Sequence, residues 1–128
     1  MKKTIICILL AVFIVSFGTI EARALGPDDT ALSYFQALKN GDIATIKGSI
    51  TGEMYQKRKV LLEQNKTYSK YLKHVYKHAD FQIKETAIQD NTAEVTVEVN
   101  SPGRQNEFVL FLKKDDLGNW KISKEISK

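Results

Sequence analysis

The chain has 128 residues, enough for one domain and too few for two. It carries 19 Lys and Arg against 15 Asp and Glu, and the resulting net charge of +4 is too mild to indicate a partner by itself. Its single cysteine excludes a scaffold held together by internal disulfides.

The first 24 residues are typical of a secretory signal peptide. Lys2 and Lys3 precede an apolar run from Ile5 to about Ile20, and Ala22-Arg23-Ala24 then places small residues where a signal peptidase cleaves. We expect cleavage after Ala24, which removes three basic residues and one acid and leaves residues 25–128 as one secreted or periplasmic domain of charge +2. The alternative is an uncleaved membrane anchor, because the apolar run is nearly long enough to span a bilayer. Cys7 lies inside the run, so the cleaved domain would have no thiol chemistry.

Two helices are expected next. Pro27 followed by two aspartates is typical of a helix start, because proline fixes φ and acids favour the positive end of the helix dipole. Apolar residues recur at helical spacing as far as Leu38, and Asn40-Gly41 ends this helix. Asp42 then caps a second, short helix that stops near Gly48.

A third, much longer helix is predicted over residues 54–79, with Thr51 as its N-cap. At about 100° per residue its apolar side chains share one broad face: Met54, Leu61, Leu62, Tyr68, Tyr71, Leu72, Val75, Tyr76 and Ala79. Its lysines share a narrow sector of the opposite face: Lys59, Lys66, Lys70, Lys73 and Lys77. This arrangement requires a helix that continues through Asn65, and a break there is the alternative.

After Asp80 the apolar period changes to two. Residues 81–85 and 93–99 alternate between apolar and polar, which is typical of strands with one wet face. Residues 108–112 are apolar on both faces and predict a central strand covered on both sides, and residues 120–126 predict the last strand. Helices followed by strands with short turns predict an α+β fold, in which three N-terminal helices pack on a curved four-stranded antiparallel sheet.

Two stretches carry a family resemblance. LSYFQALKNGDI, residues 32–43, and FVLFLKKDDLGNWKI, residues 108–122, resemble small secreted domains of the nuclear-transport-factor-2-like (NTF2-like), or cystatin-like, superfamily. More narrowly, the chain is similar to lumazine-binding-like domains of unknown function from bacterial envelopes. The resemblance implies a sheet wrapped into a cone with a pocket. It implies no activity, because the superfamily contains ketosteroid isomerase, dehydratases and polyketide cyclases beside many members without catalysis.

Pocket candidates come from strand phase. Glu85 and Lys124 fall in phase with the apolar residues before them, so inward-facing they would line a pocket, with Tyr34 or Tyr68 as hydroxyl donors. Trp120 is large enough to close the end of the cone. The favoured alternative is a bulge or frayed strand end that turns both charges into water, since Lys and Glu are rarely buried. We name no catalytic residue and expect no cofactor.

Positive charge is concentrated in one segment. Residues 55–78 carry seven basic side chains and one acid, a local charge of +6, so the rest of residues 25–128 has a charge of −4. One interpretation is attraction to an anionic envelope component, such as lipid headgroups or wall polymer, and the other is a solvated helix face. The sequence has no nucleic-acid motif, so we expect no nucleic-acid partner.

His74 and His78 stand one helical turn apart, a spacing found in some zinc sites. No third ligand is evident, and the neighbouring Lys73 and Lys77 would repel a cation, so we expect no metal site.

Three functions remain open. The favoured one is a non-catalytic binding or accessory module of the bacterial envelope, whose ligand is a small apolar molecule or an anionic surface. The second is a cofactor-free isomerase or dehydratase that uses a pocket carboxylate. The third is a structural subunit that forms a homodimer through the sheet.

Overall fold

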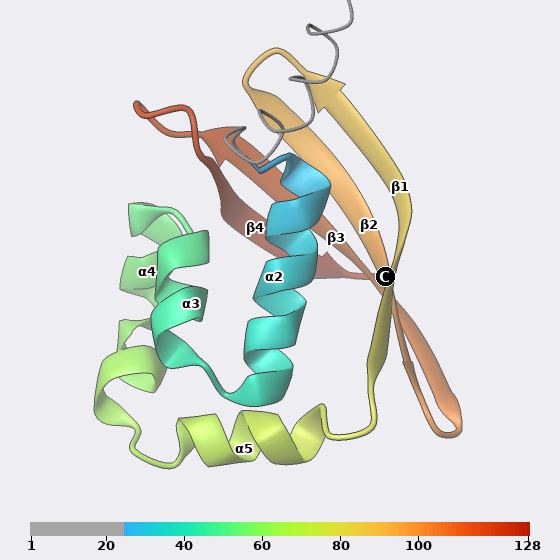
Figure 1. Ribbon diagram of the computed structural model, residues 1–128. Helices are drawn as coiled ribbons and strands as arrows, with labels where there is room; N and C mark the ends of the chain where they lie inside the picture. Colours follow the sequence, from blue (N-terminus) through green and yellow to red (C-terminus); the bar gives the residue numbers. More distant parts are fainter. Residues whose placement is uncertain (1–24) are drawn as a thin grey trace, which may run out of the picture.

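The computed structural model describes residues 25–128, and the predicted signal peptide with Cys7 lies outside the described residues. Helices α2 (Pro27–Asn40), α3 (Ile43–Ser49), α4 (Gly52–Lys59), the π-helix η1 (Val60–Gln64) and α5 (Tyr68–Val75) precede strands β1 (Asp80–Gln89), β2 (Thr92–Ser101), β3 (Arg104–Lys114) and β4 (Trp120–Ser127). The helices cover one face of the sheet (Figure 1). The predicted α+β class is confirmed. Within residues 25–128, no helix is both long and apolar enough to cross a bilayer.

Helix α2 begins and ends where its capping residues predict. Pro27 occupies its first turn, and the Asp29 carboxylate accepts a hydrogen bond from the Gly26 N–H at 3.1 Å. Gly41 ends the helix with φ 64°. A Cβ at Gly41 would lie 2.5 Å from Ser69 Oγ, so only glycine allows α5 to pack this closely on the end of α2.

The single long helix predicted over residues 54–79 is wrong. Helix α4 ends at Lys59, η1 follows, and Asn65 takes an extended conformation before α5 begins at Tyr68. The Asn65 side chain accepts hydrogen bonds from the N–H and the hydroxyl of Thr67, at 3.1 and 2.9 Å, and this local turn competes with the helix. Figure 1 shows α5 running across the end of α2. The lysines therefore do not form one stripe, because Lys59 belongs to α4.

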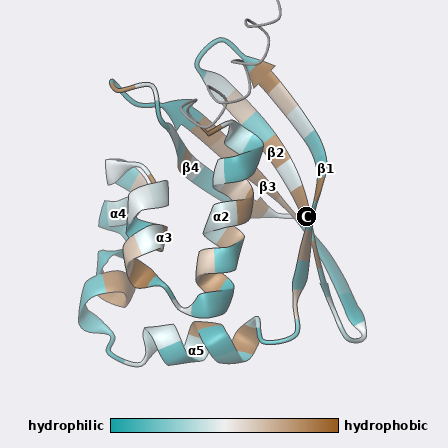
Figure 2. Ribbon diagram, in the orientation of Figure 1, coloured by the Kyte–Doolittle hydropathy of each residue, from teal (hydrophilic) through white to brown (hydrophobic). Residues whose placement is uncertain are grey.

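The sheet has the order β1-β2-β3-β4, with every pair antiparallel. Alternate residues face the helices, and the fully buried ones include Val95, Val97, Leu110 and Ile122. This alternation is visible along the strands in Figure 2. β3 is central as predicted, but no helix covers its outer face, where Val109 and Phe111 stay half-buried. That part of the prediction was wrong.

Two β-bulges interrupt the alternation. On β1, Ile83 pairs with Val97 and Glu85 with Thr96, so Lys84 is an extra residue. On β4, the pairing moves from Leu112–Ile122 to Phe111–Lys124, so Ser123 is extra. After each bulge the phase is the reverse of what uninterrupted alternation predicts.

Candidate functional site

A cavity of about 300 Å³ opens where α2, α4, η1, α5 and β4 meet. Apolar side chains form much of its wall, and the polar ones are three tyrosines, one arginine and one glutamate. Its lining residues are Tyr34, Leu38, Arg58, Leu61, Tyr68, Leu72, Tyr76 and Glu125. Beside it lies an aromatic cluster, in which the Phe35 ring lies 5.3 Å from Phe81 and 5.6 Å from Phe108. This cluster fills the space between α2 and the sheet, so the cavity lies to the side of the packed core.

Three polar side chains meet in its wall. The Tyr34 hydroxyl donates to Glu125 Oε1 at 2.7 Å, and Arg58 Nη1 donates to the Tyr34 oxygen at 2.6 Å. Arg58 Nη2 reaches the same Glu125 oxygen at 3.2 Å, which makes an ion pair. We call Tyr34, Arg58 and Glu125 the polar triad. Its members satisfy one another, as buried polar groups must.

Each member of the triad is placed by a different element. Tyr34 lies mid-way along α2 and is fully buried. Arg58 extends from the last turn of α4, just before the chain enters η1. Glu125 faces inward because the extra residue Ser123 reverses the phase of β4, and the Ser123 hydroxyl donates to the Phe111 carbonyl at 3.1 Å. The bulge therefore brings the carboxylate to the other two.

Burial dominates the electrostatics of this wall. It raises the pKa of Tyr34 far above its ordinary value, and the neighbouring Glu125 carboxylate adds to the rise. Burial also raises the pKa of Tyr76 to about 12 and that of Tyr68 above its usual range. Burial opposes the charge of Arg58, but Tyr34 and Glu125 outweigh it and hold the pKa of Arg58 above its ordinary value. The wall thus has neutral phenols and a permanent cation.

Arg58 has the greatest capacity to bind a ligand. A guanidinium carries five N–H donors, and the triad occupies only one on each of Nη1 and Nη2. The Arg58 side chain is 28% exposed, whereas that of Glu125 is 15% exposed. An acidic group entering the cavity would meet the guanidinium at one end and Leu38, Leu61 and Leu72 along the wall.

The structure brings together two of the five predicted pocket residues, since Tyr34 and Tyr68 line the cavity. Glu85 does not, because the bulge at Lys84 turns it to the exposed outer face. The inward orientation considered for Glu85 is therefore wrong, and the favoured alternative, a bulge that turns this charge into water, is confirmed.

Lys124 and Trp120 also lie away from the cavity. Lys124 points outward with its Nζ 5.7 Å from the centre of the Phe111 ring, so its inward orientation is wrong for the same reason as that of Glu85. Trp120 is buried at the opposite end of β4 beside Ser49, under the amine of Lys114. The prediction that Trp120 lines the pocket is therefore wrong.

Sequence reasoning missed Glu125 and the role of Arg58. Glu125 directly follows Lys124, so one extra residue at Ser123 exchanges which of the two side chains faces inward. Arg58 was counted with the basic segment. An arginine among lysines is a weak signal, although it is the residue suited to forked recognition of carboxylates.

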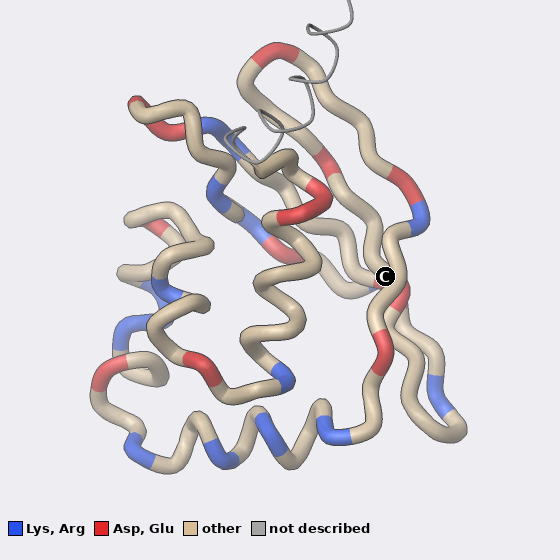
Figure 3. The backbone as a smooth tube through the Cα atoms, viewed as in Figure 1, with Lys and Arg blue, Asp and Glu red and all other residues tan. Residues whose placement is uncertain are grey.

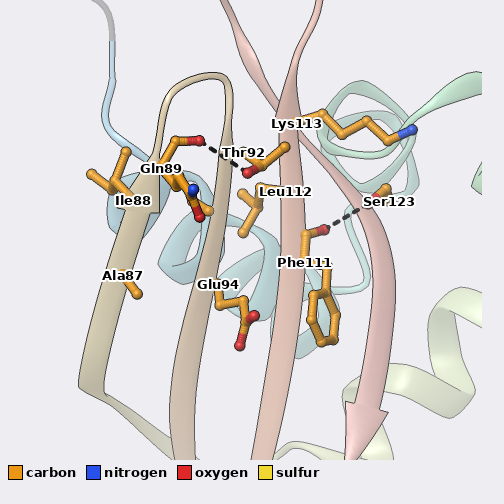
Figure 4. Close-up of a pocket in the computed structure, with 10 residues that line it drawn as sticks. Ala87, Ile88, Gln89, Thr92, Glu94, Phe111, Leu112, Lys113 and Ser123 are labelled. Atoms are coloured by element: carbon orange, nitrogen blue, oxygen red, sulfur yellow. Dashed lines mark hydrogen bonds between the residues drawn. The ribbon is translucent and has the colours of Figure 1, made fainter.

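The outer face of the sheet carries a second hollow, of about 320 Å³, near the β1–β2 turn. In Figure 4, Glu94 and Phe111 project from the sheet on the side opposite the helices. None of its polar lining residues is buried, whereas Tyr34 in the cavity wall is, so this hollow is a weaker candidate than the cavity. The described residues hold no cluster of three or more His, Cys, Asp or Glu that could bind a metal.

Comparisons with known proteins agree on the fold. Four chains of solved structures match, and three of them are as follows. A candidate NTF2-like transpeptidase from Campylobacter jejuni is 19% identical with a TM-score of 0.62, covering 78% of this chain and 99% of that one. An NTF2-like protein of unknown function from Silicibacter pomeroyi is 15% identical with a TM-score of 0.57, covering 79% and 90%.

A candidate ketosteroid isomerase from Shewanella frigidimarina is 19% identical with a TM-score of 0.57, covering 78% of this chain and 92% of that one. The chain has an NTF2-like fold. No family model and no curated protein matches the sequence. The superfamily resemblance is thus confirmed as to fold, and the narrower lumazine-binding-like resemblance stays a prediction.

Proposed function

We propose that this NTF2-like chain is a non-catalytic binding module of the bacterial envelope, which holds a small ligand with an apolar body and an acidic end. The observation that carries the proposal is the pairing in the polar triad. Tyr34, Arg58 and Glu125 hold one another, while the guanidinium keeps donors free towards a cavity whose other walls are largely leucine and tyrosine. A volume of about 300 Å³ is at the small end of ligand pockets.

The pairing also argues against acid–base chemistry. Tyr34 has a strongly raised pKa, so its hydroxyl stays protonated. Glu125 Oε1 already accepts hydrogen bonds from both partners, and a substrate proton would compete with them. The second candidate, an isomerase or dehydratase, would use Glu125 in place of Glu85. Its support is the carboxylate in the cavity wall together with the likeness to a candidate isomerase.

The test compares two probes of equal length, octanoate and octanol, by isothermal titration. We expect octanoate to bind more tightly, because only the carboxylate engages Arg58. Arg58→Gln should lower octanoate affinity about tenfold and leave octanol nearly unchanged, since a hydrogen bond to a charged group contributes about 1.5–3 kcal/mol. Leu61→Ala should weaken both probes, and the matched control Leu117→Ala, in an exposed turn, should weaken neither.

Equal affinity for octanoate and octanol, with no effect of Arg58→Gln, would contradict the proposal. Glu125→Gln separates the two candidate functions, because it retains the shape of the cavity. A binding module keeps octanol affinity in this variant. An enzyme instead loses turnover of a ketosteroid probe that the wild-type chain converts.

A further inference from the structure

The cavity opens beside a row of exposed apolar side chains. Among the described residues, eight large apolar side chains are exposed, and four of them fall in the short segment 60–75: Val60, Leu61, Tyr71 and Val75. Leu61 and Tyr68 share the cavity wall, and the Tyr71 ring stacks on Tyr68 with centroids 6.2 Å apart. Val75 follows one helical turn later on the same side of α5. We call Leu61, Tyr71 and Val75 the rim.

The rim is exposed for a structural reason. Helix α5 buries Leu72, its half-buried Ser69 donates a hydrogen bond to the Gly41 carbonyl at the end of α2, and Tyr76 is half-buried beside Phe81. Tyr71 and Val75 lie on the flank of that face, so they remain 60% and 47% exposed. Contiguous exposed apolar groups of this kind mark interaction sites.

Four lysines lie on or beside the helix that carries Tyr71 and Val75. Lys66, Lys70, Lys73 and Lys77 lie along or beside α5, and Figure 3 shows this helix with basic positions and no acidic one. None of the four makes a salt bridge with a residue of the range 25–128, where the ion pairs belong to Lys47, Arg58, Lys84 and Lys128. The one acid of the basic segment, Glu63, is neutralised by Lys47 at 2.6 Å.

We propose that this face docks on an anionic phospholipid surface. A lysine-rich helix that exposes an aromatic and an aliphatic flank has the two components of interfacial binding, electrostatic attraction to headgroups and shallow apolar insertion. Tyrosine is suited to the headgroup level, where one end is apolar and the other wet. Lys70 lies in α5 and Lys66 and Lys77 lie just beyond its two ends, and long lysine stems allow their charged ends to reach headgroups around the inserted rim. An anionic polymer in solution would satisfy the lysines and leave the rim unused.

The docked orientation places the mouth of the cavity on the lipid layer, because Leu61 belongs to both the rim and the cavity wall. The docking proposal does not depend on what the cavity holds. It would stand if the titrations with octanoate failed.

The experiment must separate this face from the apolar segment Ile5–Ile20, which has its own affinity for bilayers. The full chain carrying Cys7→Ser receives one cysteine with an environment-sensitive dye, at Tyr71 or at the control position Leu117. We expect vesicles with about one third phosphatidylglycerol to shift the Tyr71 dye to an apolar spectrum and to leave the Leu117 dye unchanged. Added salt should reverse the shift.

Two matched pairs of variants complete the test. Replacing Lys66, Lys70, Lys73 and Lys77 by Gln should lower vesicle affinity about fivefold for each lysine that reaches the surface. The control replaces four lysines on or next to the sheet, Lys84, Lys113, Lys124 and Lys128, for the same loss of charge, and should change affinity much less. Tyr71→Ser with Val75→Ser should weaken binding about tenfold, and Ile88→Ser with Leu117→Ser should not.

Three outcomes would overturn the proposal. The first is vesicle binding that leaves the Tyr71 dye unchanged. The second is an equal loss from both lysine sets, which would mean that only bulk charge matters. The third is binding to a soluble polyphosphate with none to vesicles, which would assign the face to a polymer.

Discussion

Each of the two β-bulges inserts one extra residue, but the two have opposite effects on the glutamate that follows. On β1, the extra residue Lys84 turns Glu85 out to water. On β4, the extra residue Ser123 turns Lys124 out and Glu125 in. The difference lies in what covers each strand. Helices α2 and α4 lie over the end of β4 and supply Tyr34 and Arg58, whereas β1 beyond its bulge is exposed throughout. A bulge therefore contributes to a site only where helices cover the strand and contact the side chain that the bulge has turned inward.

The largest expected effect comes from removing the carboxylate that follows each bulge. Glu125→Ala leaves the half-buried Arg58 without its counter-ion, and we expect the free energy of unfolding to fall by about 3 kcal/mol. Glu85→Ala removes an exposed side chain and should change it by less than about 0.5 kcal/mol. Urea unfolding of both variants gives the comparison.

A double variant checks the cause. Arg58→Met with Glu125→Leu removes both charges and should recover much of the stability lost in Glu125→Ala, because an apolar pair tolerates burial. Equal losses in Glu125→Ala and Glu85→Ala would contradict the role assigned to the covering layer.

The two bulges should also act at opposite ends of the pH scale. Near the β4 bulge, burial raises the pKa values of Tyr34 and of Tyr76, the latter to about 12, so the folded state holds protons that the unfolded chain releases near pH 10. Stability is complete below about pH 10 and falls as pH rises through about 12, by up to about 1.4 kcal/mol per pH unit for each such tyrosine. Tyr34→Phe should flatten this loss in unfolding measurements.

Near the β1 bulge the sign is reversed. Hydrogen bonds from Asn100 and Gln105, with the charge of Lys84, lower the pKa of Glu98. Its contribution is present at neutral pH and is lost as pH falls through that lowered value. Glu98→Gln should flatten the acid limb and leave the alkaline limb intact. A variant that moved both limbs would show that the two regions are coupled.

Tyr34→Phe at neutral pH gives a smaller effect. The ring stays packed edge-on against Phe35 at 5.4 Å, and only the hydroxyl between Arg58 and Glu125 is lost. Since the ion pair at 3.2 Å remains, we expect a loss of about 1 kcal/mol. Tyr71→Phe is the control, because that hydroxyl is exposed and should contribute nothing measurable to urea unfolding. A loss above that of Glu125→Ala would mean that Tyr34, and not the ion pair, holds the triad together.

Sequence periodicity predicted the elements well and the site poorly. Caps and alternation depend on neighbours in the chain, which is why α2, α3 and the four strands were predicted with the right type and order. The break at Asn65 depends on a side-chain turn that competes with the helix, and periodicity only allowed it. The triad depends on a one-residue shift at Ser123 and on contacts 67 and 91 residues apart, which no local pattern contains.

The outward lysines beside the two bulges give the smallest expected effects. Lys124 lies over the Phe111 ring, and Lys124→Ala should cost about 0.5 kcal/mol, the value of an exposed cation–π contact. Lys84 lies 3.6 Å from Glu98, but Asn100 and Gln105 still hold that carboxylate after Lys84→Ala, so no loss should be resolved by urea unfolding. A large loss in either variant would mean that the outer face is itself covered, because a lysine in water contributes little. Sedimentation analysis would then test for a dimer through the sheet, with Val109, Phe111 and Ile126 at its centre.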